Sequence, residues 1–301
     1  MTGKVIMDIF KDIFERALGF IEGGICRCII AMILSACSMN SADASRRHPM
    51  NDAAHQILIV YDNNTLKGDL TPAWGFSCLI ILPPYQILFD SGGDPSILLK
   101  NMHEMDIDPE KIDTVVLSHG HGDHVGGLAG FLRYQHGVTV YLPKSFPKRF
   151  KEEVGLMGAD VEEVGGFVMI HPGVYTSGEL GGGLKEQSLV LKTCQGLVII
   201  TGCAHPGIVE IVEHVRKLFE ENVYLLIGGF HLMGRSPMEI RRIMDKLDEL
   251  KVERIAPCHC SGDTAKELFI HHYEDNYIAC GVGLSLEIPA DGPSFTPVQT
   301  A

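Results

Sequence analysis

Four residues of types that commonly bind metal ions stand close together near the middle of the chain: His119, His121, Asp123 and His124. Imidazole nitrogens and carboxylate oxygens are ligands that Zn²⁺ and similar dications take. Alternate side chains of an extended backbone point the same way, so His119 and His121 should face one ion. Asp123 and His124 should diverge toward a second centre. The alternative, a loop rich in histidine by chance, is a poor explanation for four such residues in six positions.

The neighbours of this cluster predict the elements that hold it. Residues 114–117 are apolar and mostly β-branched, which indicates a short buried strand. Apolar residues at helical spacing begin at Val125. The four residues should therefore lie on a loop between the end of a strand and the start of a helix.

The spacing His119-x-His121-x-Asp123-His124 after a buried strand resembles the signature of the metallo-β-lactamase superfamily. Other motifs resemble the branch that includes the methanopterin-pathway enzyme 7,8-dihydropterin-6-methyl-4-(β-D-ribofuranosyl)aminobenzene-5′-phosphate synthase. In chain order these motifs are Asp62-Asn63-Asn64-Thr65, Trp74-Gly75-Phe76-Ser77, Ile87-Leu88-Phe89-Asp90, Glu186-Gln187-Ser188-Leu189, Gly202-Cys203-Ala204-His205-Pro206-Gly207-Ile208 and Gly228-Gly229-Phe230-His231-Leu232. The resemblance covers about residues 55 to 290 and implies an α/β fold of the αββα sandwich type.

The resemblance also implies two divalent metal ions, each held by three residues. Zinc is the favoured ion, with manganese and iron as alternatives. Each of the two later histidines has a structural alternative. His205 could be a helix-entry residue that hydrogen-bonds the backbone, and His259 could be a surface loop residue. The implied sets are His119, His121 and His205 for one ion, and Asp123, His124 and His259 for the other.

Three further polar residues are candidates for supporting or substrate-binding roles. Asp90 ends a strand beside glycines, and in the superfamily this aspartate supports the histidine loop through hydrogen bonds; the alternative is a simple Asx turn. His231 also follows a strand and could hydrogen-bond substrate or polarise a leaving group, or be structural. Glu186 is a candidate substrate or metal contact, with a solvated carboxylate as the alternative.

Cysteine usage raises one specific question. Cys203 stands where most of the superfamily has an aspartate that bridges the two metals. As a thiolate ligand it would favour zinc over manganese or magnesium; otherwise it is a buried neutral thiol. Cys258 and Cys260 flank His259 and should point away from it in an extended chain, so we interpret them as structural. Nine cysteines without a Cys-x-x-Cys pair indicate no disulfide framework.

Two adjacent metal ions would lower the pKa of a bound water to near 7 and polarise a substrate oxygen. Asp123 would hold one metal and orient the resulting hydroxide. The sequence therefore predicts a metal-dependent hydrolase that acts on an ester or phosphoester of a small molecule. One alternative is a pterin-pyrophosphate condensing synthase of the dihydropterin-aminobenzene-phosphate type, in which the metals stabilise the departing pyrophosphate. Another is an inactive metal-binding sensor or scaffold.

Composition sets further bounds. An apolar fraction of 46% in 301 residues is enough for a sizeable core. The net charge is −13, and residues 1–54 contribute nothing to it because their six basic residues balance six acidic ones. An acidic catalytic part repels phosphate backbones, so no nucleic-acid partner is expected.

Residues 1–54 are predicted to be a leader and linker. Residues 1–24 show helical periodicity, and a short apolar run ends in Leu34-Ser35-Ala36-Cys37, which resembles a bacterial lipobox. Lipidation of Cys37 would anchor the protein at the cell envelope. The alternative is an amphipathic helix followed by a buried or membrane-surface segment, and the cytoplasm stays open as the location. The catalytic domain is predicted to occupy residues 55–301.

Strands are expected in two batches, each followed by helices, which predicts two similar halves packed sheet to sheet. Residues 143–185 are rich in Gly, Pro and charge, and we interpret them as a mobile cover over the site. The expected strands are 56–61, 76–82, 86–89, 114–117, 138–142, 187–191, 197–201, 224–227 and 252–256, and the expected helices are 95–103, 208–219 and 237–250.

Overall fold

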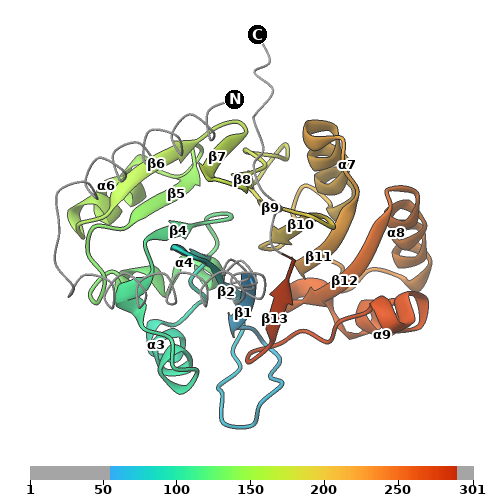
Figure 1. The fold of residues 1–301 in the computed structure, drawn as a ribbon, viewed down its shortest axis with the longest axis horizontal. Helices are drawn as coiled ribbons and strands as arrows, with labels where there is room; N and C mark the ends of the chain where they lie inside the picture. Colours follow the sequence, from blue (N-terminus) through green and yellow to red (C-terminus); the bar gives the residue numbers. More distant parts are fainter. Residues whose placement is uncertain (1–54, 290–301) are drawn as a thin grey trace, which may run out of the picture. The chain divides into compact units, whose positions relative to one another are not determined.

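A computed structural model describes residues 55–289 of the chain. The predicted leader, with its lipobox at Cys37, lies outside the described residues. The first sheet has the order β13-β1-β2-β3-β4-β5-β6 (Figure 1). Its strands are β1 (His55–Tyr61), β2 (Ser77–Leu82), β3 (Tyr85–Phe89), β4 (Thr114–Val116), β5 (Thr139–Pro143), β6 (Asp160–Val164) and β13 (Ser285–Ile288).

The second sheet has the order β12-β11-β10-β9-β8-β7. Its strands are β7 (Val168–His171), β8 (Val174–Thr176), β9 (Leu189–Thr193), β10 (Gly196–Thr201), β11 (Val223–Gly229) and β12 (Val252–Cys258). Helices α3 (Pro95–Glu104), α4 (Gly122–Val125), α5 (Leu128–Phe131) and α6 (Lys148–Leu156) accompany the first sheet. Helices α7 (Ile208–Phe219), α8 (Pro237–Glu249) and α9 (Asp263–Tyr273) accompany the second.

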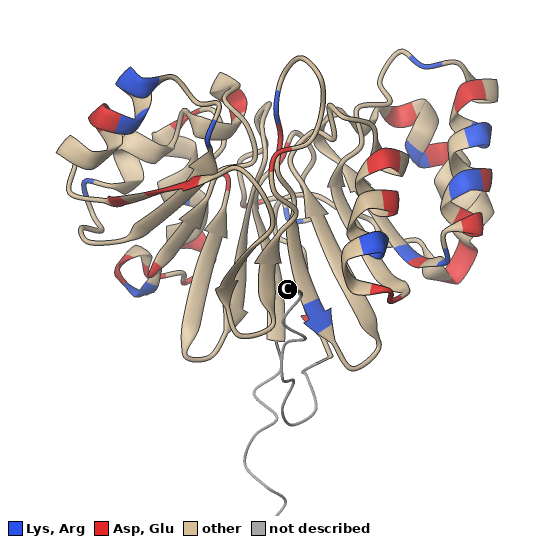
Figure 2. Cartoon of the chain, turned by 90° about the horizontal axis from the view of Figure 1, so that it is seen from above, with Lys and Arg blue, Asp and Glu red and all other residues tan. Residues whose placement is uncertain are grey.

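Alternating side chains along the strands build three hydrophobic layers. Cys78 and Ile80 of β2 face the core between the two sheets, and Leu79 faces the core under the first set of helices. In β10, Ile200 faces the central core and Ile199 faces the helices of the second sheet. Figure 2 shows that Lys, Arg, Asp and Glu lie mostly on the helices and seldom on the strands. The prediction of an αββα sandwich is confirmed.

Strand direction brings the candidate residues to one edge. In the first sheet β3 and β4 are parallel, and β1 runs the same way because it is antiparallel to β2, which is antiparallel to β3. In the second sheet β10, β11 and β12 are parallel. Parallel strands end at the same edge of a sheet, and ligands of open α/β sheets bind beyond the carboxyl ends. Most of the motifs identified in the sequence follow these ends. The motifs that begin at Trp74 and Glu186 instead precede the antiparallel strands β2 and β9, whose amino ends lie at the same edge.

The interpretation of residues 143–185 as an irregular cover was wrong. This segment contains α6, β6, β7 and β8, so it completes the far ends of both sheets. The picture of two consecutive halves also needs a correction, because β13 returns from the end of the described chain to pair with β1 in the first sheet. Within residues 55–289, no helix combines the length and apolar character needed to cross a bilayer.

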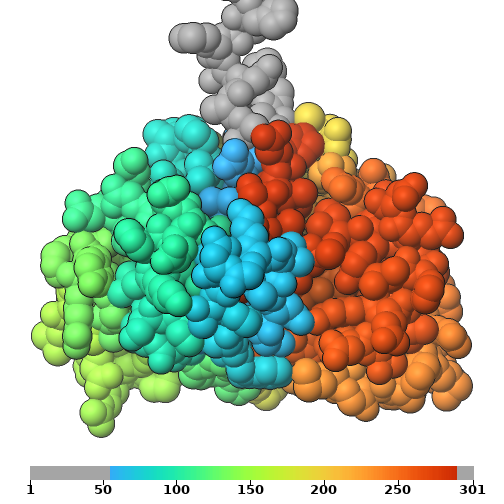
Figure 3. Space-filling model, turned by 90° about the horizontal axis from the view of Figure 1, so that it is seen from below, coloured from blue at the N-terminus to red at the C-terminus, as the bar shows by residue number. Residues whose placement is uncertain are grey.

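The segment after β1 lies against the C-terminal part of the fold. Figure 3 shows these two parts of the chain side by side. Asn64 O accepts a hydrogen bond from Val282 N at 2.8 Å, and Asn63 Nδ2 donates to His259 O at 2.8 Å.

The two sheets approach closely at Gly202, where a Cβ atom would lie 2.1 Å from Ser118 Oγ. Glycine at 202 is therefore what lets the end of β10 meet the histidine loop.

Candidate metal centre

Ligand-type side chains from both sheets converge at this edge. Among residues 55–289, five groups of three such residues have potential ligand atoms within 4.8 Å of one another. Two of these groups are the sets that the resemblance implied. The groups are His119, His121 and His205; His119, His124 and Cys203; Cys203, His259 and Cys260; Cys203, His205 and His231; and Asp123, His124 and His259.

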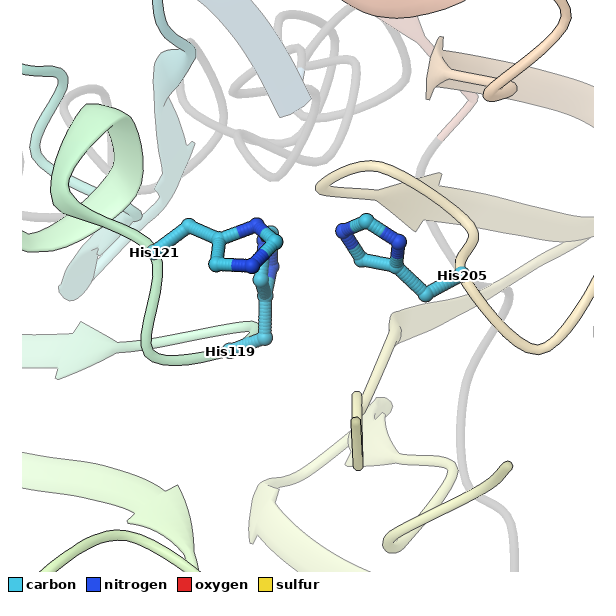
Figure 4. Close-up of side chains that lie close together, drawn as sticks. All are labelled: His119, His121 and His205. Carbon is cyan, nitrogen blue, oxygen red and sulfur yellow. The ribbon is translucent and has the colours of Figure 1, made fainter. Parts of the chain in front are cut away.

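The first group joins the loop after β4 to the loop after β10. Figure 4 shows His119 and His121 on one loop, with His205 facing them from the other. His119 Nε2 lies 3.1 Å from His121 Nδ1. The ring of His205 lies 4.7 Å from that of His119 and 4.9 Å from that of His121, measured between centroids. Three imidazoles therefore surround one small space.

The second group joins the helix α4 to the loop after β12. His124 Nε2 lies 3.2 Å from His259 Nε2. Asp123 Oδ2 lies 3.4 Å from His259 Nε2 and 3.7 Å from His124 Nε2. Both histidines are fully buried. A carboxylate and two imidazole nitrogens thus point at a common position.

Asp90 and Ser118 fix the orientation of two of these histidines. Asp90 Oδ2 lies 2.7 Å from His124 Nδ1 and accepts a hydrogen bond from Ser118 Oγ, also at 2.7 Å. Ser118 Oγ in turn lies 2.9 Å from His119 Nδ1. A carboxylate only accepts hydrogen bonds, so the proton of His124 must be on Nδ1. The Nε2 atoms of both rings are left facing the centre, as metal-binding histidines require.

His259 is oriented in the same manner by Asp62 and Asn63, for which the sequence predicted no role at the site. Its Nδ1 lies 3.0 Å from Asn63 Oδ1, and its backbone N–H donates to Asp62 Oδ2 at 2.9 Å. Asp62 is fully buried. The available signal was an Asp-Asn pair at the end of a strand that runs parallel to β3 and β4. The indole of Trp74, half exposed, lies 4.9 Å from the imidazole of His259 between centroids.

Glu186 was a candidate substrate or metal contact, but its carboxylate is buried and hydrogen-bonded to the backbone. Its side chain is 1% exposed, and Oε1 accepts hydrogen bonds from the backbone N–H groups of Cys203 and Ala204, both at 2.9 Å. Oε2 accepts one from His205 N at 2.8 Å. Burial raises the pKa of Glu186, and these three hydrogen bonds act against that rise. Glu186 therefore shapes the loop that carries Cys203 and His205, and the alternative of a solvated carboxylate is wrong because the side chain is buried.

Two left-handed residues change which side chains reach the site. Ala204 has φ 62° and His259 has φ 48°, so neither loop continues the alternation of an extended strand. Cys203 Sγ lies 3.2 Å from His124 Nε2. Cys260 was predicted to point away from His259, and that was wrong, because the turn at His259 brings both residues into one ligand group. Cys258 is fully buried in the core between the sheets, in keeping with a structural role.

His231 lies at the outer side of the first group. Its ring centroid is 4.5 Å from that of His205, and its backbone is left-handed with φ 53°. A hydrogen bond with Cys260 raises the pKa of His231, and burial acts in the opposite direction. A cavity of about 210 Å³ opens beside it and is lined in part by His205, Pro206 and Arg235.

The protonation states suit a cation. Burial, together with the neighbouring histidines, holds the pKa of His119 far below its usual range. Burial and His231 lower the pKa of His205 to about 4. The pKa of Asp123 is well below normal, because hydrogen bonding to His259 and the charge of His124 outweigh the effect of burial. His119 and His205 are therefore neutral and Asp123 is ionised near pH 7, and these are the forms that bind metals. His124 differs, because Asp90 raises its pKa despite burial.

One orphaned atom tests whether these residues fit a metal. His205 Nε2 is buried and has no hydrogen-bond partner among the described residues. A buried polar atom without a partner costs about 1–3 kcal/mol. Coordination of an ion with His119 and His121 would satisfy it, so the donor set fits a metal.

The comparisons with known proteins agree with this geometry. The sequence profile described as "Metallo-beta-lactamase superfamily" matches residues 83–259, which include the histidine loop and end at His259. The chain belongs to the metallo-β-lactamase superfamily. Proteins of this fold generally bind divalent metals.

Relatives within the superfamily include both a synthase and a hydrolase. The chain is 30% identical over 237 residues to the 7,8-dihydropterin-6-methyl-4-(β-D-ribofuranosyl)-aminobenzene-5′-phosphate synthase of Methanocaldococcus jannaschii, covering 64% of this chain and 81% of that protein. An uncharacterised protein of the same organism is 30% identical over 239 residues, covering 68% and 90% of the two chains. A crystal structure described as a metal-dependent hydrolase of the β-lactamase superfamily has a TM-score of 0.67 and 29% identity, covering 78% of this chain and 99% of that chain.

Proposed function

We propose that the protein is a metal-dependent hydrolase that cleaves an ester or phosphoester of a small molecule at a dinuclear centre. The observation that carries this proposal is the pair of adjoining ligand groups at one edge of the sandwich. One ion would be held by His119, His121 and His205. The other would be held by Asp123, His124 and His259, with Cys203 between the two groups as a further ligand.

Bound dications would supply Lewis acidity and lower the pKa of a coordinated water to near 7. The chain's own residues do the rest of the work. The Asp123 carboxylate, 22% exposed, can accept a hydrogen bond from water at the centre and so orient it. Asp90 holds His124 in the tautomer whose Nε2 faces the ion, and Asn63 does the same for His259. Burial of His119, His124 and His259 excludes bulk water from one side of the site.

The cavity beside His205 is suited to bind an anionic group of the substrate. His231 and Arg235 both line it. Arg235 is 54% exposed and lies 3.4 Å from Glu239, so its guanidinium retains donors for another acceptor. A phosphate seated there would adjoin the first ligand group, where His231 can donate a hydrogen bond to a leaving oxygen. A phosphoester is therefore favoured over a neutral ester.

The test is a metal-loaded activity screen across carboxylic esters, phosphomonoesters, phosphodiesters and pterin pyrophosphates, read by product mass. Wild-type protein purified without chelator should contain close to two metal ions, as counted by elemental analysis. His121→Ala should lose metal and nearly all turnover, whereas Arg235→Ala should keep its metal and raise KM for phosphorylated substrates only. Full metal content and rate in His121→Ala would refute the site assignment.

A second candidate is condensation of a pterin pyrophosphate with an aromatic amine. It is favoured by the 30% identity to the archaeal synthase over 81% of its length. The half-exposed indole of Trp74 beside His259 also offers a partner on which a planar ring could stack. Trp74→Ala should then raise KM for pterin substrates and leave KM for simple phosphoesters unchanged. A product mass equal to the two substrates minus pyrophosphate would favour the synthase. Metal binding without turnover in any arm would favour a sensor or scaffold.

A further inference from the structure

Cys260 is a buried thiol that the catalytic proposal does not use. It is 5% exposed and belongs to the short 3₁₀ helix His259–Ser261 that follows β12. Its sulfur lies within 4.8 Å of the ligand atoms of Cys203 and His259. A thiol that only fills space is expected among apolar side chains. This one faces a second thiol and an imidazole.

The backbone is shaped to bring the two thiols together. His259 in the left-handed conformation lets two consecutive residues, His259 and Cys260, face the same side. Gly229 at the end of β11 leaves the space that they need, because a Cβ there would lie 2.8 Å from Cys260 Sγ and 3.3 Å from Cys203 Cα. The close approach of these cysteines therefore depends on a residue without a side chain.

The sulfur of Cys260 has polar partners in His231 and the backbone of Cys203. Its contact with the backbone oxygen of Cys203, at 3.6 Å, is a weak one for a thiol donor. Cys203 Sγ reaches His124 Nε2 at 3.2 Å, so the thiol pair adjoins the nitrogens that face the second ion. Cys258, only two residues before Cys260, is buried in the core between the sheets and belongs to none of the ligand groups.

We propose that Cys260 joins Cys203 as a second sulfur ligand of the ion bound by His259, which makes this centre selective for a soft dication such as zinc. The inference rests on the proposed metal centre and extends it. Thiolates prefer zinc to magnesium or manganese, and structural and catalytic zinc sites commonly contain more than one sulfur. Two thiolates would also neutralise more of the ion's charge than the single bridging carboxylate that stands at the position of Cys203 in most of the superfamily.

X-ray absorption at the zinc edge tests this directly, because Zn–S distances of about 2.3 Å are separated from Zn–N distances of about 2.0–2.1 Å. Zinc-loaded wild-type protein with two ions should show about one sulfur per zinc on average. Cys260→Ala and Cys203→Ala should each lose about half of that sulfur signal. The matched control Cys258→Ala removes a thiol two residues away, at the end of β12, and should leave the signal unchanged.

Cobalt substitution gives a second measurement, since each Co–S bond adds a ligand-to-metal charge-transfer absorption that Cys260→Ala should reduce. If that variant does not fold, as judged by circular dichroism, Cys260→Ser replaces it and should show the same loss of sulfur. An unchanged sulfur count in the Cys260 variant, with two zinc ions still bound, would overturn the Cys260 ligand and leave the metal enzyme intact. Wild-type protein that binds no zinc would overturn both.

Discussion

Asp90 is the residue on which the orientation of the histidine loop depends. Its two oxygens accept hydrogen bonds from Ser118 N at 2.7 Å, from Ser118 Oγ and from His124 Nδ1. Asp90→Asn would place an amide donor where these groups also donate, so His124 would switch to the tautomer with a proton on Nε2. We expect metal affinity to fall roughly 10- to 100-fold, as measured by competition with a chelator of known affinity.

Asp94→Asn is the matched control for that substitution. Asp94 caps α3 by accepting hydrogen bonds from Ser96 N and Ile97 N, and asparagine caps helices equally well. Its metal affinity should equal that of wild type. An Asp90→Asn protein with wild-type affinity would mean that the ring of His124 is held by packing alone.

The metal-free protein should lose stability as the pH falls. His205 has a pKa of about 4 in the folded state, below its ordinary value near 6.5. Between these values the unfolded state binds a proton that the folded state does not, so stability decreases as pH falls from about 6.5 toward 4. His119 acts in the same direction. His124 opposes them, because Asp90 raises its pKa despite burial.

Urea denaturation in the presence of chelator at pH 7 and pH 5.5 measures this effect. His205→Gln should lose less unfolding free energy between these two pH values than wild type does, because it removes one of the groups that must stay neutral. Equal losses in the two proteins would contradict the assignment of His205 as a buried neutral imidazole.

At the scale of the element, helix α8 has an N-terminus that the sequence specifies completely. Ser236 Oγ accepts a hydrogen bond from Glu239 N at 3.3 Å, and Glu239 Oε2 accepts one from Ser236 N at 2.9 Å. Pro237 occupies the first helical position. Ser236→Ala should lower the free energy of unfolding by about 1 kcal/mol without changing metal content. Ser285→Ala, at an exposed position of β13, should change it by less than about 0.5 kcal/mol.

Elements with a strong local pattern were predictable, and elements that depend on distant partners were not. The β-branched run of β10 and the amphipathic pattern of α7 are legible in a single segment. In contrast β6 reads Asp-Val-Glu-Glu-Val, with three exposed acidic residues, and is a strand because it pairs with β5. The strand β13 likewise exists through its pairing with β1.

The candidate site likewise has residues that a local pattern predicts and residues that only distant contacts place. The histidine loop is a local signature, so all four of its candidate ligands could be named from the sequence. The contacts that orient His259 come from Asp62 and Asn63, 197 and 196 residues away in the chain. The direction of Cys260 depends on the left-handed φ of His259, which periodicity arguments do not anticipate because they assume a regular backbone.

At the scale of the whole molecule, the metal ions would join the two sheets. Ligands come from the loop after β4 in the first sheet and from the loops after β10 and β12 in the second. An ion at 100 times its Kd stabilises the folded state by about 2.7 kcal/mol. For a domain of this size, chelation should lower Tm by roughly 5–10 °C in differential scanning fluorimetry, and added zinc should restore it.

The control for chelation is His121→Ala, whose Tm should respond less to chelator because it binds less metal. Identical responses of variant and wild type would show that chelator acts elsewhere on the protein.

The pairing of β1 with β13 has a consequence for the order of folding during synthesis. His55 pairs with Ile288, so β1, the first strand of residues 55–289 to leave the ribosome, acquires one of its two neighbours only when nearly all of these residues have been made. Until then β1 has an unpaired edge, which is a template for association with other chains. His259 likewise reaches Asp62 only late. The nascent protein therefore completes its sheet edge and its metal site in the same final stage, and a chain truncated before β13 would be prone to aggregate.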